Sequence, residues 1–186
     1  MPEITKQQRV YDGKLIQVDV VEETRDGGGV QQREVVHHKP GVAIVVMQEH
    51  SDVVVYGYQV IMVEHYRTPI GVRLTELVAG MVDEGETPLE AAKRELGEEV
   101  GLEAGQWDEL GTLYTSPGFT DEAITLYLAR DVRGASAKTD EKEQLSLCMV
   151  PFALALEQVR KGEIQDMKTV AGLLWTSRVL EEERNE

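Results

Sequence analysis

The segment from residue 80 to residue 102 constrains this chain most, because it contains the clearest helix and ends that helix in acidic side chains. Thr87 is a good N-cap residue, Pro88 suits the first helical position, and the glutamate three residues after Thr87 completes a capping box. Apolar side chains recur at helical spacing, and Gly101 is placed to end the helix. The sequence therefore predicts a helix over residues 87–100.

Three glutamates, Glu95, Glu98 and Glu99, lie within one turn of each other near the end of this helix. Like charges at this spacing disfavour a helix by about 0.2–0.5 kcal/mol per pair, and a helix C-terminus favours cations. Arg94 can pair with Glu98 and offset part of the repulsion. One interpretation is a solvated acidic face. The other is a bound divalent cation, since clustered carboxylates suit Mg²⁺, Mn²⁺ or Ca²⁺.

The same segment resembles the Nudix box, G-x5-E-x7-R-E-U-x-E-E-x-G-U with U aliphatic, at every defined position. The matching residues are Gly80, Glu86, Arg94, Glu95, Leu96, Glu98, Glu99, Gly101 and Leu102. The resemblance implies an α/β (α+β) fold, namely an α/β/α sandwich with a mixed sheet. It also implies metal-dependent hydrolysis of a pyrophosphate bond in a nucleoside diphosphate derivative, which favours the metal site over the solvated acidic face.

The resemblance further implies roles for individual residues. The implied metal ligands are Glu95, Glu98, Glu99 and the backbone carbonyl of Ala79. They would hold two or three Mg²⁺ or Mn²⁺ ions per site, which makes Glu98 and Glu99 catalytic. The residues expected to hold the loop and helix of the box together are Gly80, Glu86, Arg94 and Gly101.

Residues that flank the box resemble the ADP-ribose pyrophosphatase and nucleotide-sugar branch of this family. Tyr66-Arg67-Thr68-Pro69 is similar to Q-Y-R-x-P with His65 in place of Gln, and residues 76–80 are similar to E-L-P-A-G with Val78 in place of Pro. Pro117 lies fifteen residues after Leu102, a separation associated with ADP-ribose, within a loop, 116–122, close to that branch's own. The implied substrate-binding residues are Arg67, Glu76, Pro117, Gly118 and Glu122. The resemblance thus favours cleavage of ADP-ribose to AMP and ribose 5-phosphate.

Several of these flanking residues have simpler interpretations. Arg67 can be an ordinary surface residue, although a guanidinium fork fits phosphate oxygens. Pro117-Gly118 is a turn on any interpretation. The aromatic side chains of Tyr11, Tyr66 and Phe119 are candidates to stack on the base, but aromatic residues are more often part of a core.

A carboxylate outside the helix is expected to accept a proton from the attacking water. The acidic loop at 139–144 occupies the place where this branch carries that glutamate, and Glu141 and Glu143 are the candidates. The sequence does not separate the two, and a solvated charged turn is the alternative.

The rest of the chain predicts two regions. Residues 1–40 indicate β-strands and resemble the small domain through which this branch dimerises, so we expect a homodimer. Residues 41–186 would form the Nudix domain, with further strands and two closing helices at 152–161 and 166–182. His37 and His38 are expected to be an exposed pair on a strand.

The composition excludes several classes of function. With 34 acidic and 19 basic residues the net charge is −15, which disfavours binding to nucleic acid or to an anionic membrane. No stretch is long and apolar enough to span a bilayer, and the N-terminus lacks the apolar core of a secretory signal, so a cytoplasmic protein is expected. The single cysteine, Cys148, is expected to be a buried structural thiol.

Three alternatives remain for the function. The chain could act on another nucleoside diphosphate derivative, such as a nucleotide sugar, a dinucleoside polyphosphate, or a flavin or coenzyme A derivative. It could be a nucleotide-binding module without catalysis, although the complete box argues against this. An RNA-decapping or RNA-binding member is disfavoured by the acidic charge.

Overall fold

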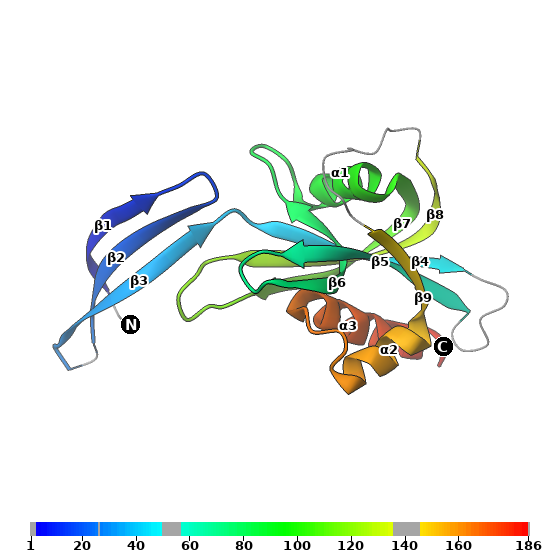
Figure 1. The fold of residues 1–186 in the computed structure, drawn as a ribbon. Helices are drawn as coiled ribbons and strands as arrows, with labels where there is room; N and C mark the ends of the chain where they lie inside the picture. The colour runs from blue at the N-terminus through cyan, green and yellow to red at the C-terminus, as the bar shows by residue number, and fades with distance from the viewer. Residues whose placement is uncertain (1–2, 26, 50–56, 136–145, 186) are drawn as a thin grey trace. The chain divides into compact units, whose positions relative to one another are not determined.

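In the computed structural model the chain folds into two compact units (Figure 1). The described residues are 3–25, 27–49, 57–135 and 146–185. The larger unit comprises residues 41–112 and 125–186, and the smaller comprises residues 1–40 and 113–124. The chain therefore contributes two separate segments to each unit.

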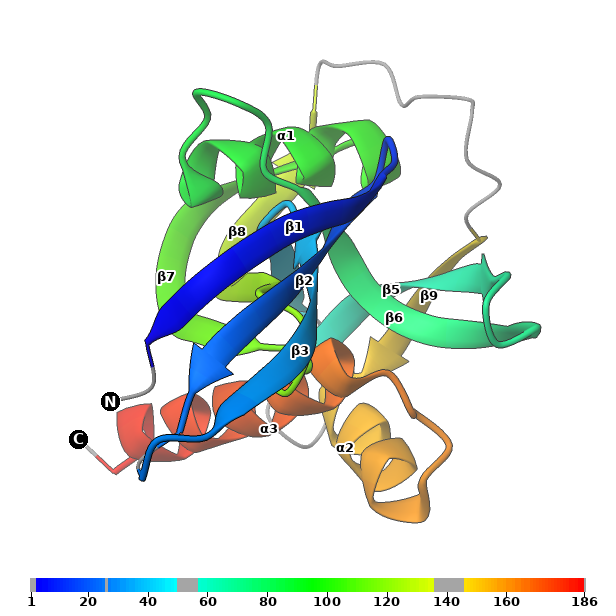
Figure 2. The ribbon, with the colours of Figure 1, turned by 90° about the vertical axis from the view of Figure 1, so that its left-hand side faces the viewer.

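The larger unit is built on a six-stranded sheet with the strand order β7-β8-β4-β6-β5-β9. The strands are β4 (Gly41–Glu49), β5 (Tyr58–Arg67), β6 (Val72–Met81), β7 (Leu102–Tyr114), β8 (Ala123–Gly134) and β9 (Ser146–Pro151). Helix α1 (Pro88–Val100) covers one face, whereas α2 (Phe152–Lys161) and α3 (Met167–Glu183) lie on the other, as Figures 1 and 2 show from two directions. The expected α/β/α sandwich with a mixed sheet is confirmed.

Helix α1 begins and ends where the sequence predicts. Thr87 is the N-cap; its side chain accepts a hydrogen bond from the amide of Glu90, whose carboxylate accepts one from the amide of Thr87 at 2.8 Å. Gly101 ends the helix with φ of 67°, a left-handed conformation that glycine adopts without strain. Both ends are therefore set by local chemistry.

The apolar face of α1 packs into the main core of the larger unit. Its buried residues are Ala91, Ala92, Leu96 and Val100. They belong to one cluster with side chains of β4, β6 and β8, among them Ile44, Val78 and Tyr127. Burial of each large apolar side chain stabilises the fold by about 1.5–3 kcal/mol, so this packing fixes the rotation of α1 and hence the position of its glutamates over β6.

Strand β6 changes its hydrogen-bonding neighbour halfway along. Residues 78–81 pair with β4, whereas residues 72–77 pair with β5. At the changeover the amide of Leu77 donates to the Thr169 hydroxyl (2.9 Å), a side chain in the first turn of α3. Helix α3 comes very close here, because a Cβ at Gly172 would lie 2.7 Å from Leu77 Cδ1 and 3.0 Å from Val45 Cγ2. The first turn of α3 thus replaces part of a missing strand neighbour.

The smaller unit is an antiparallel sheet of three strands in the order β1-β2-β3. The strands are β1 (Ile4–Asp12), β2 (Ile16–Thr24) and β3 (Val30–His38). Asp19, in the middle of β2, is only 1% exposed and is hydrogen-bonded by Arg9, by Gln7 (2.5 Å) and by His37 (3.1 Å). Hydrogen bonds from Arg9 and Gln7 lower the pKa of Asp19 to about 2, so this buried carboxylate is charged at neutral pH.

The segment 113–124 attaches to β3 through backbone and side-chain contacts. The amide of Val36 donates to the Phe119 carbonyl (2.7 Å), and the amide of Asp121 donates to the Val36 carbonyl (3.2 Å). His37 Nδ1 lies 2.5 Å from Asp121 Oδ2, while its Nε2 faces Asp19. A neutral imidazole has one N–H, so only the protonated ring donates to both carboxylates. The hydrogen bond with Asp121, with that to Asp19, raises the pKa of His37 above 6.5.

Some expectations need adjustment. The sequence did not indicate β6 as a complete strand. His37 and His38 are half-buried and hydrogen-bonded, and Cys148 is half-buried.

Among the described residues, no helix is long and apolar enough to cross a membrane.

We expect the hold of His37 on Asp121 to depend on pH. A raised pKa means that the stabilisation is complete below 6.5 and is lost as the pH rises through the higher value in the folded protein. Hydrogen exchange of the Val36 and Asp121 amides, corrected for intrinsic rates, should therefore show a drop in protection above that pH. The same measurement on His37→Gln should show no such step, and a step of equal size in both proteins would contradict the assignment.

Candidate metal-binding and substrate-binding site

The carboxyl end of α1 holds three glutamates and, in its last turn, which the structure describes in full, no basic residue. These are Glu95, Glu98 and Glu99. The side chain of Glu95 is 14% exposed and that of Glu98 is 46% exposed. Burial raises the pKa of Glu95, although Arg94 opposes this effect. The site therefore combines a largely covered carboxylate and a half-exposed one, three residues apart on the helix.

Arg94 is the centre of this cluster. Its Nε and Nη2 each lie 3.0 Å from an oxygen of Glu86, and its Nη1 lies 2.7 Å from Glu95 and 3.2 Å from Glu98. Nη2 also donates to the carbonyl of Met81 (2.9 Å), the last residue of β6. These contacts, led by the hydrogen bond to Glu86, raise the pKa of Arg94. One guanidinium therefore joins the end of β6, the loop before α1 and the helix itself.

Gly80 leaves the space that the Glu95 side chain occupies beside β6. A Cβ at residue 80 would overlap the side chain of Glu95. On the neighbouring residue, the amide of Ala79 lies 3.4 Å from Glu99 Oε2, a long hydrogen bond. Strand β6 and α1 thus bring the predicted backbone ligand, Ala79, close to one predicted carboxylate ligand, Glu99.

The donor chemistry of this cluster suits a hard divalent cation, because every side-chain donor is a carboxylate oxygen. Among the residues described, however, no three His, Cys, Asp or Glu side chains converge as a ligand set. Glu95 and Glu98 are instead both bonded to Arg94. Coordination by these two residues would therefore exchange part of the Arg94 contacts for metal contacts, and the metal assignment stays a prediction.

Arg67 and Glu76 form a second polar group on β5 and β6. Arg67 donates through Nε and Nη2 to the two oxygens of Glu76, each at 2.7 Å. Glu76 is 1% exposed and is also bonded by Lys168. Burial raises the pKa of Glu76, but the hydrogen bonds from Arg67 and Lys168 outweigh it and lower the pKa to about 2. A contact of Glu76 with substrate would therefore be indirect, through Arg67, which is 40% exposed.

The other predicted substrate residues lie in the smaller unit. Ser116 accepts hydrogen bonds from the amides of Phe119 and Thr120 at 3.1 Å, which closes the turn containing Pro117 and Gly118. Glu122 accepts from the hydroxyl of Thr115 (2.8 Å) and lies 3.3 Å from His38. Their substrate contacts stay predictions. Tyr11, Tyr66 and Phe119 are each at least half-exposed. Both candidate bases, Glu141 and Glu143, lie outside the described residues.

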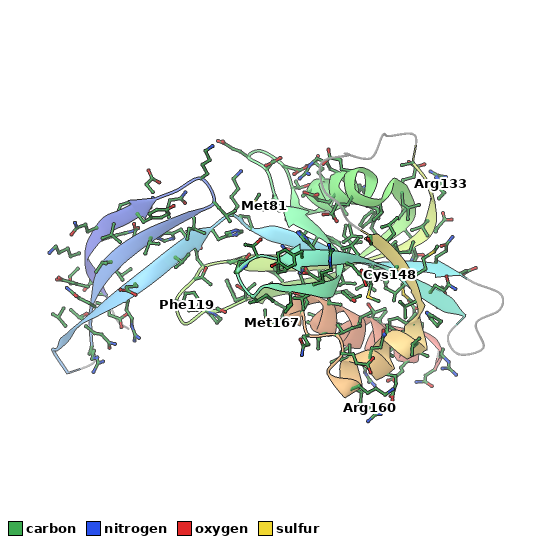
Figure 3. The ribbon with its side chains drawn as sticks, viewed as in Figure 1. Met81, Phe119, Arg133, Cys148, Arg160 and Met167 are labelled. Atoms are coloured by element: carbon green, nitrogen blue, oxygen red, sulfur yellow. The ribbon has the colours of Figure 1, made fainter. Side chains whose placement is uncertain are left out.

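The sequence did not reveal the contribution of α3. Lys168 is separated from Glu76 by 92 residues, and no local pattern links them. The only signal was Asp166, whose position suggested a helix start and whose carboxylate does cap α3 by accepting from the Thr169 amide at 2.9 Å. In Figure 3, the label Met81 marks the end of β6 from which the loop to α1 departs, and Met167 marks the start of α3 on the opposite face of the sheet.

Comparisons with known proteins agree with this arrangement. The family model described as the NUDIX domain matches residues 37–171. The chain is 42% identical over 151 residues to the ADP-ribose pyrophosphatase of Mycobacterium tuberculosis, which covers 80% of this chain and 70% of that protein. It is 33% identical to the ADP-ribose pyrophosphatase of Bacillus subtilis (89% and 86% covered) and 31% identical to the GDP-mannose pyrophosphatase of Cronobacter sakazakii (79% of each).

A crystal structure titled as that of an ADP compounds hydrolase has the same fold. It superposes with a TM-score of 0.84 and covers 98% of this chain and 95% of its own, at 24% sequence identity. At that identity the likeness supports the fold alone.

Replacement of Arg94 by lysine should destabilise the larger unit. The ammonium of lysine is a single point charge and cannot bridge Glu86, Glu95 and the Met81 carbonyl together. We expect Arg94→Lys to lower the free energy of unfolding by about 1–2 kcal/mol in urea titrations.

Arg133→Lys is the matched control, because the Arg133 side chain is 68% exposed and forms a surface ion pair with Glu103. It should change stability by less than about 0.5 kcal/mol. Equal stabilities of the two variants would refute the central role of Arg94.

Proposed function

We propose that this chain, which belongs to the Nudix hydrolase family, hydrolyses ADP-ribose to AMP and ribose 5-phosphate. It is a Nudix pyrophosphohydrolase, and the proposal concerns its substrate. The observation that carries the choice of substrate is the 42% identity to an ADP-ribose pyrophosphatase over 80% of the chain. The exposed guanidinium of Arg67, set beside a buried carboxylate, adds a group suited to a diphosphate.

Each residue of the cluster has a part in this proposal. Nudix enzymes generally use divalent metal ions, which supply charge neutralisation of the diphosphate and activation of water when bound. Glu95, Glu98 and Glu99, with the carbonyl of Ala79, would hold Mg²⁺ or Mn²⁺, two or three ions per site. Arg94 and Glu86 keep the loop and helix in register.

The reaction itself is a displacement at phosphorus. The oxygen of water forms a bond to one phosphorus of the diphosphate, and the bond from that phosphorus to the bridging oxygen breaks. Arg67 would hold the non-reacting phosphate oxygens and so orient the diphosphate. Glu141 or Glu143 would accept the proton of the attacking water.

A second candidate substrate is a nucleotide sugar. It is favoured by relatives of 31–34% identity that are GDP-mannose pyrophosphatases, with 79% of this chain covered. Both candidates contain a diphosphate between a nucleoside and a sugar, so the cluster on α1 would serve either, and the difference lies in contacts with the base and the sugar.

A substrate panel tests the proposal. We expect the purified protein with Mg²⁺ or Mn²⁺ to release phosphatase-sensitive products from ADP-ribose with a higher kcat/KM than from GDP-mannose or a dinucleoside polyphosphate. A higher kcat/KM for GDP-mannose would replace ADP-ribose by the second candidate. No turnover of any compound would contradict the proposed hydrolysis.

The same assay tests the cluster. Glu99→Gln removes a charge from the proposed ligand set and should lower kcat/KM by about 100-fold. Glu103→Gln is the control, because this exposed carboxylate pairs with Arg133 at the surface. Full activity of Glu99→Gln would show that the metal assignment is wrong.

We also propose that the protein is a homodimer formed through residues 1–40. Every residue of β1 is exposed, and the strand includes Ile4, Val10 and Tyr11, each more than half exposed. Exposed apolar side chains on a small sheet suit a surface that another chain covers.

Light scattering of the purified protein should give the mass of two chains, about twice 20.8 kDa. Replacement of Ile4 and Val10 by aspartate should convert the dimer to a monomer, since charges at those positions would resist burial. A wild-type protein that is monomeric in light scattering would contradict the proposed homodimer.

A further inference from the structure

The carboxylate of Glu76 is shared by two cations from different elements. Arg67 on β5 approaches it with two nitrogens, and Lys168 on α3 donates to its Oε2. The exposed fractions of the three side chains are 40% for Arg67, 11% for Lys168 and 1% for Glu76. Only the guanidinium therefore offers a substantial surface to solvent, while the carboxylate and the ammonium form its support.

The ammonium of Lys168 is itself held in place. It lies 2.9 Å from Asp166 Oδ1, and the other oxygen of Asp166 caps α3 by accepting from the Thr169 amide at 2.9 Å. The hydroxyl of Thr169 in turn accepts from the amide of Leu77, next to Glu76 in β6. Two connections thus join the first turn of α3 to β6, one through the backbone of Leu77 and one through Lys168.

The charges of this group balance only when Lys168 is present. Arg67 and Lys168 carry two positive charges, and Glu76 and Asp166 carry two negative charges. Without the ammonium the group would be left with a net charge of −1. A buried carboxylate is stable only beside a cation. Arg67 would therefore become the only strong partner of Glu76, and the guanidinium would be drawn toward the buried carboxylate.

An anionic diphosphate would therefore meet a weaker positive field, and a guanidinium held toward Glu76, in the absence of Lys168. We propose that Lys168 is a positioning residue for substrate binding, which acts through Glu76 to hold the guanidinium of Arg67 toward the diphosphate. This inference rests on the proposed function, because it takes Arg67 as a diphosphate contact.

A double-mutant cycle tests the inference, with kcat and KM measured on the compound of the substrate panel that is hydrolysed most efficiently. Arg67→Gln should raise KM, and Lys168→Met should raise KM by about tenfold with kcat within about twofold, because uniform binding is lost. In the Arg67→Gln protein, Lys168→Met should add less than about twofold, since its effect passes through Arg67. Lys168→Arg should restore most of the affinity.

Lys161→Met is the matched control. Lys161 is a half-exposed lysine on α2 that pairs with Glu157 at 3.7 Å, so the variant loses the same charge away from Glu76. Its KM should equal that of the wild type. If Lys168→Met does not fold, as judged by circular dichroism and thermal unfolding, Lys168→Gln takes its place in the cycle.

The outcomes separate this inference from the proposed function. If Arg67→Gln raises KM but the Lys168 variants do not, the positioning role is refuted and the proposed function stands. If Lys168→Met raises KM equally in both backgrounds, it acts independently of Arg67 and the inference is refuted. If Arg67→Gln leaves KM unchanged, Arg67 is not a diphosphate contact and the inference fails with that assignment.

Discussion

The guanidinium of Arg94 is the interaction on which the larger unit's site depends. Helix α1 carries three glutamates in its last two turns, where the helix dipole and their mutual repulsion both oppose it. Arg94 opposes this repulsion, and its hydrogen bonds reach Glu86, Glu95, Glu98 and the end of β6. Arg94 therefore offsets part of this repulsion, because it faces the same side of the helix as Glu95 and Glu98.

Strand β6 connects this cluster to the rest of the unit. Its last residues lie under α1, where Gly80 leaves room for Glu95, and its middle residues meet the first turn of α3. The change of neighbour from β4 to β5 makes this possible. It leaves the Leu77 amide to donate to the Thr169 hydroxyl, and it places Glu76 within reach of Lys168. One strand thus carries both polar groups, on segments only a few residues apart.

Local features of the sequence were enough to predict α1, since Thr87, Pro88 and Gly101 act on their own neighbours, and the spacing of the box identified the family. The partners of Glu76 and His37 were beyond such reasoning. Lys168 and Asp121 lie 92 and 84 residues away, and no local pattern in the sequence pairs either of them with its partner. The change of neighbour along β6 was equally hidden, because strand pairing depends on residues that periodicity does not relate. The loop with Glu141 and Glu143 lies outside the described residues, so the base remains a prediction from resemblance.

The discontinuous smaller unit has a consequence for the order in which the protein is made. Residues 1–40 leave the ribosome before the segment 113–124, which supplies partners of Val36 and His37. During synthesis these contacts can form only after about two-thirds of the 186 residues have emerged. Until then His37 lacks Asp121, one of the two carboxylates that it contacts. Contacts between distant segments slow folding, because the intervening loop must close first. A fragment that stops before residue 113 therefore contains all three strands of the sheet but lacks the partners of Val36 and His37.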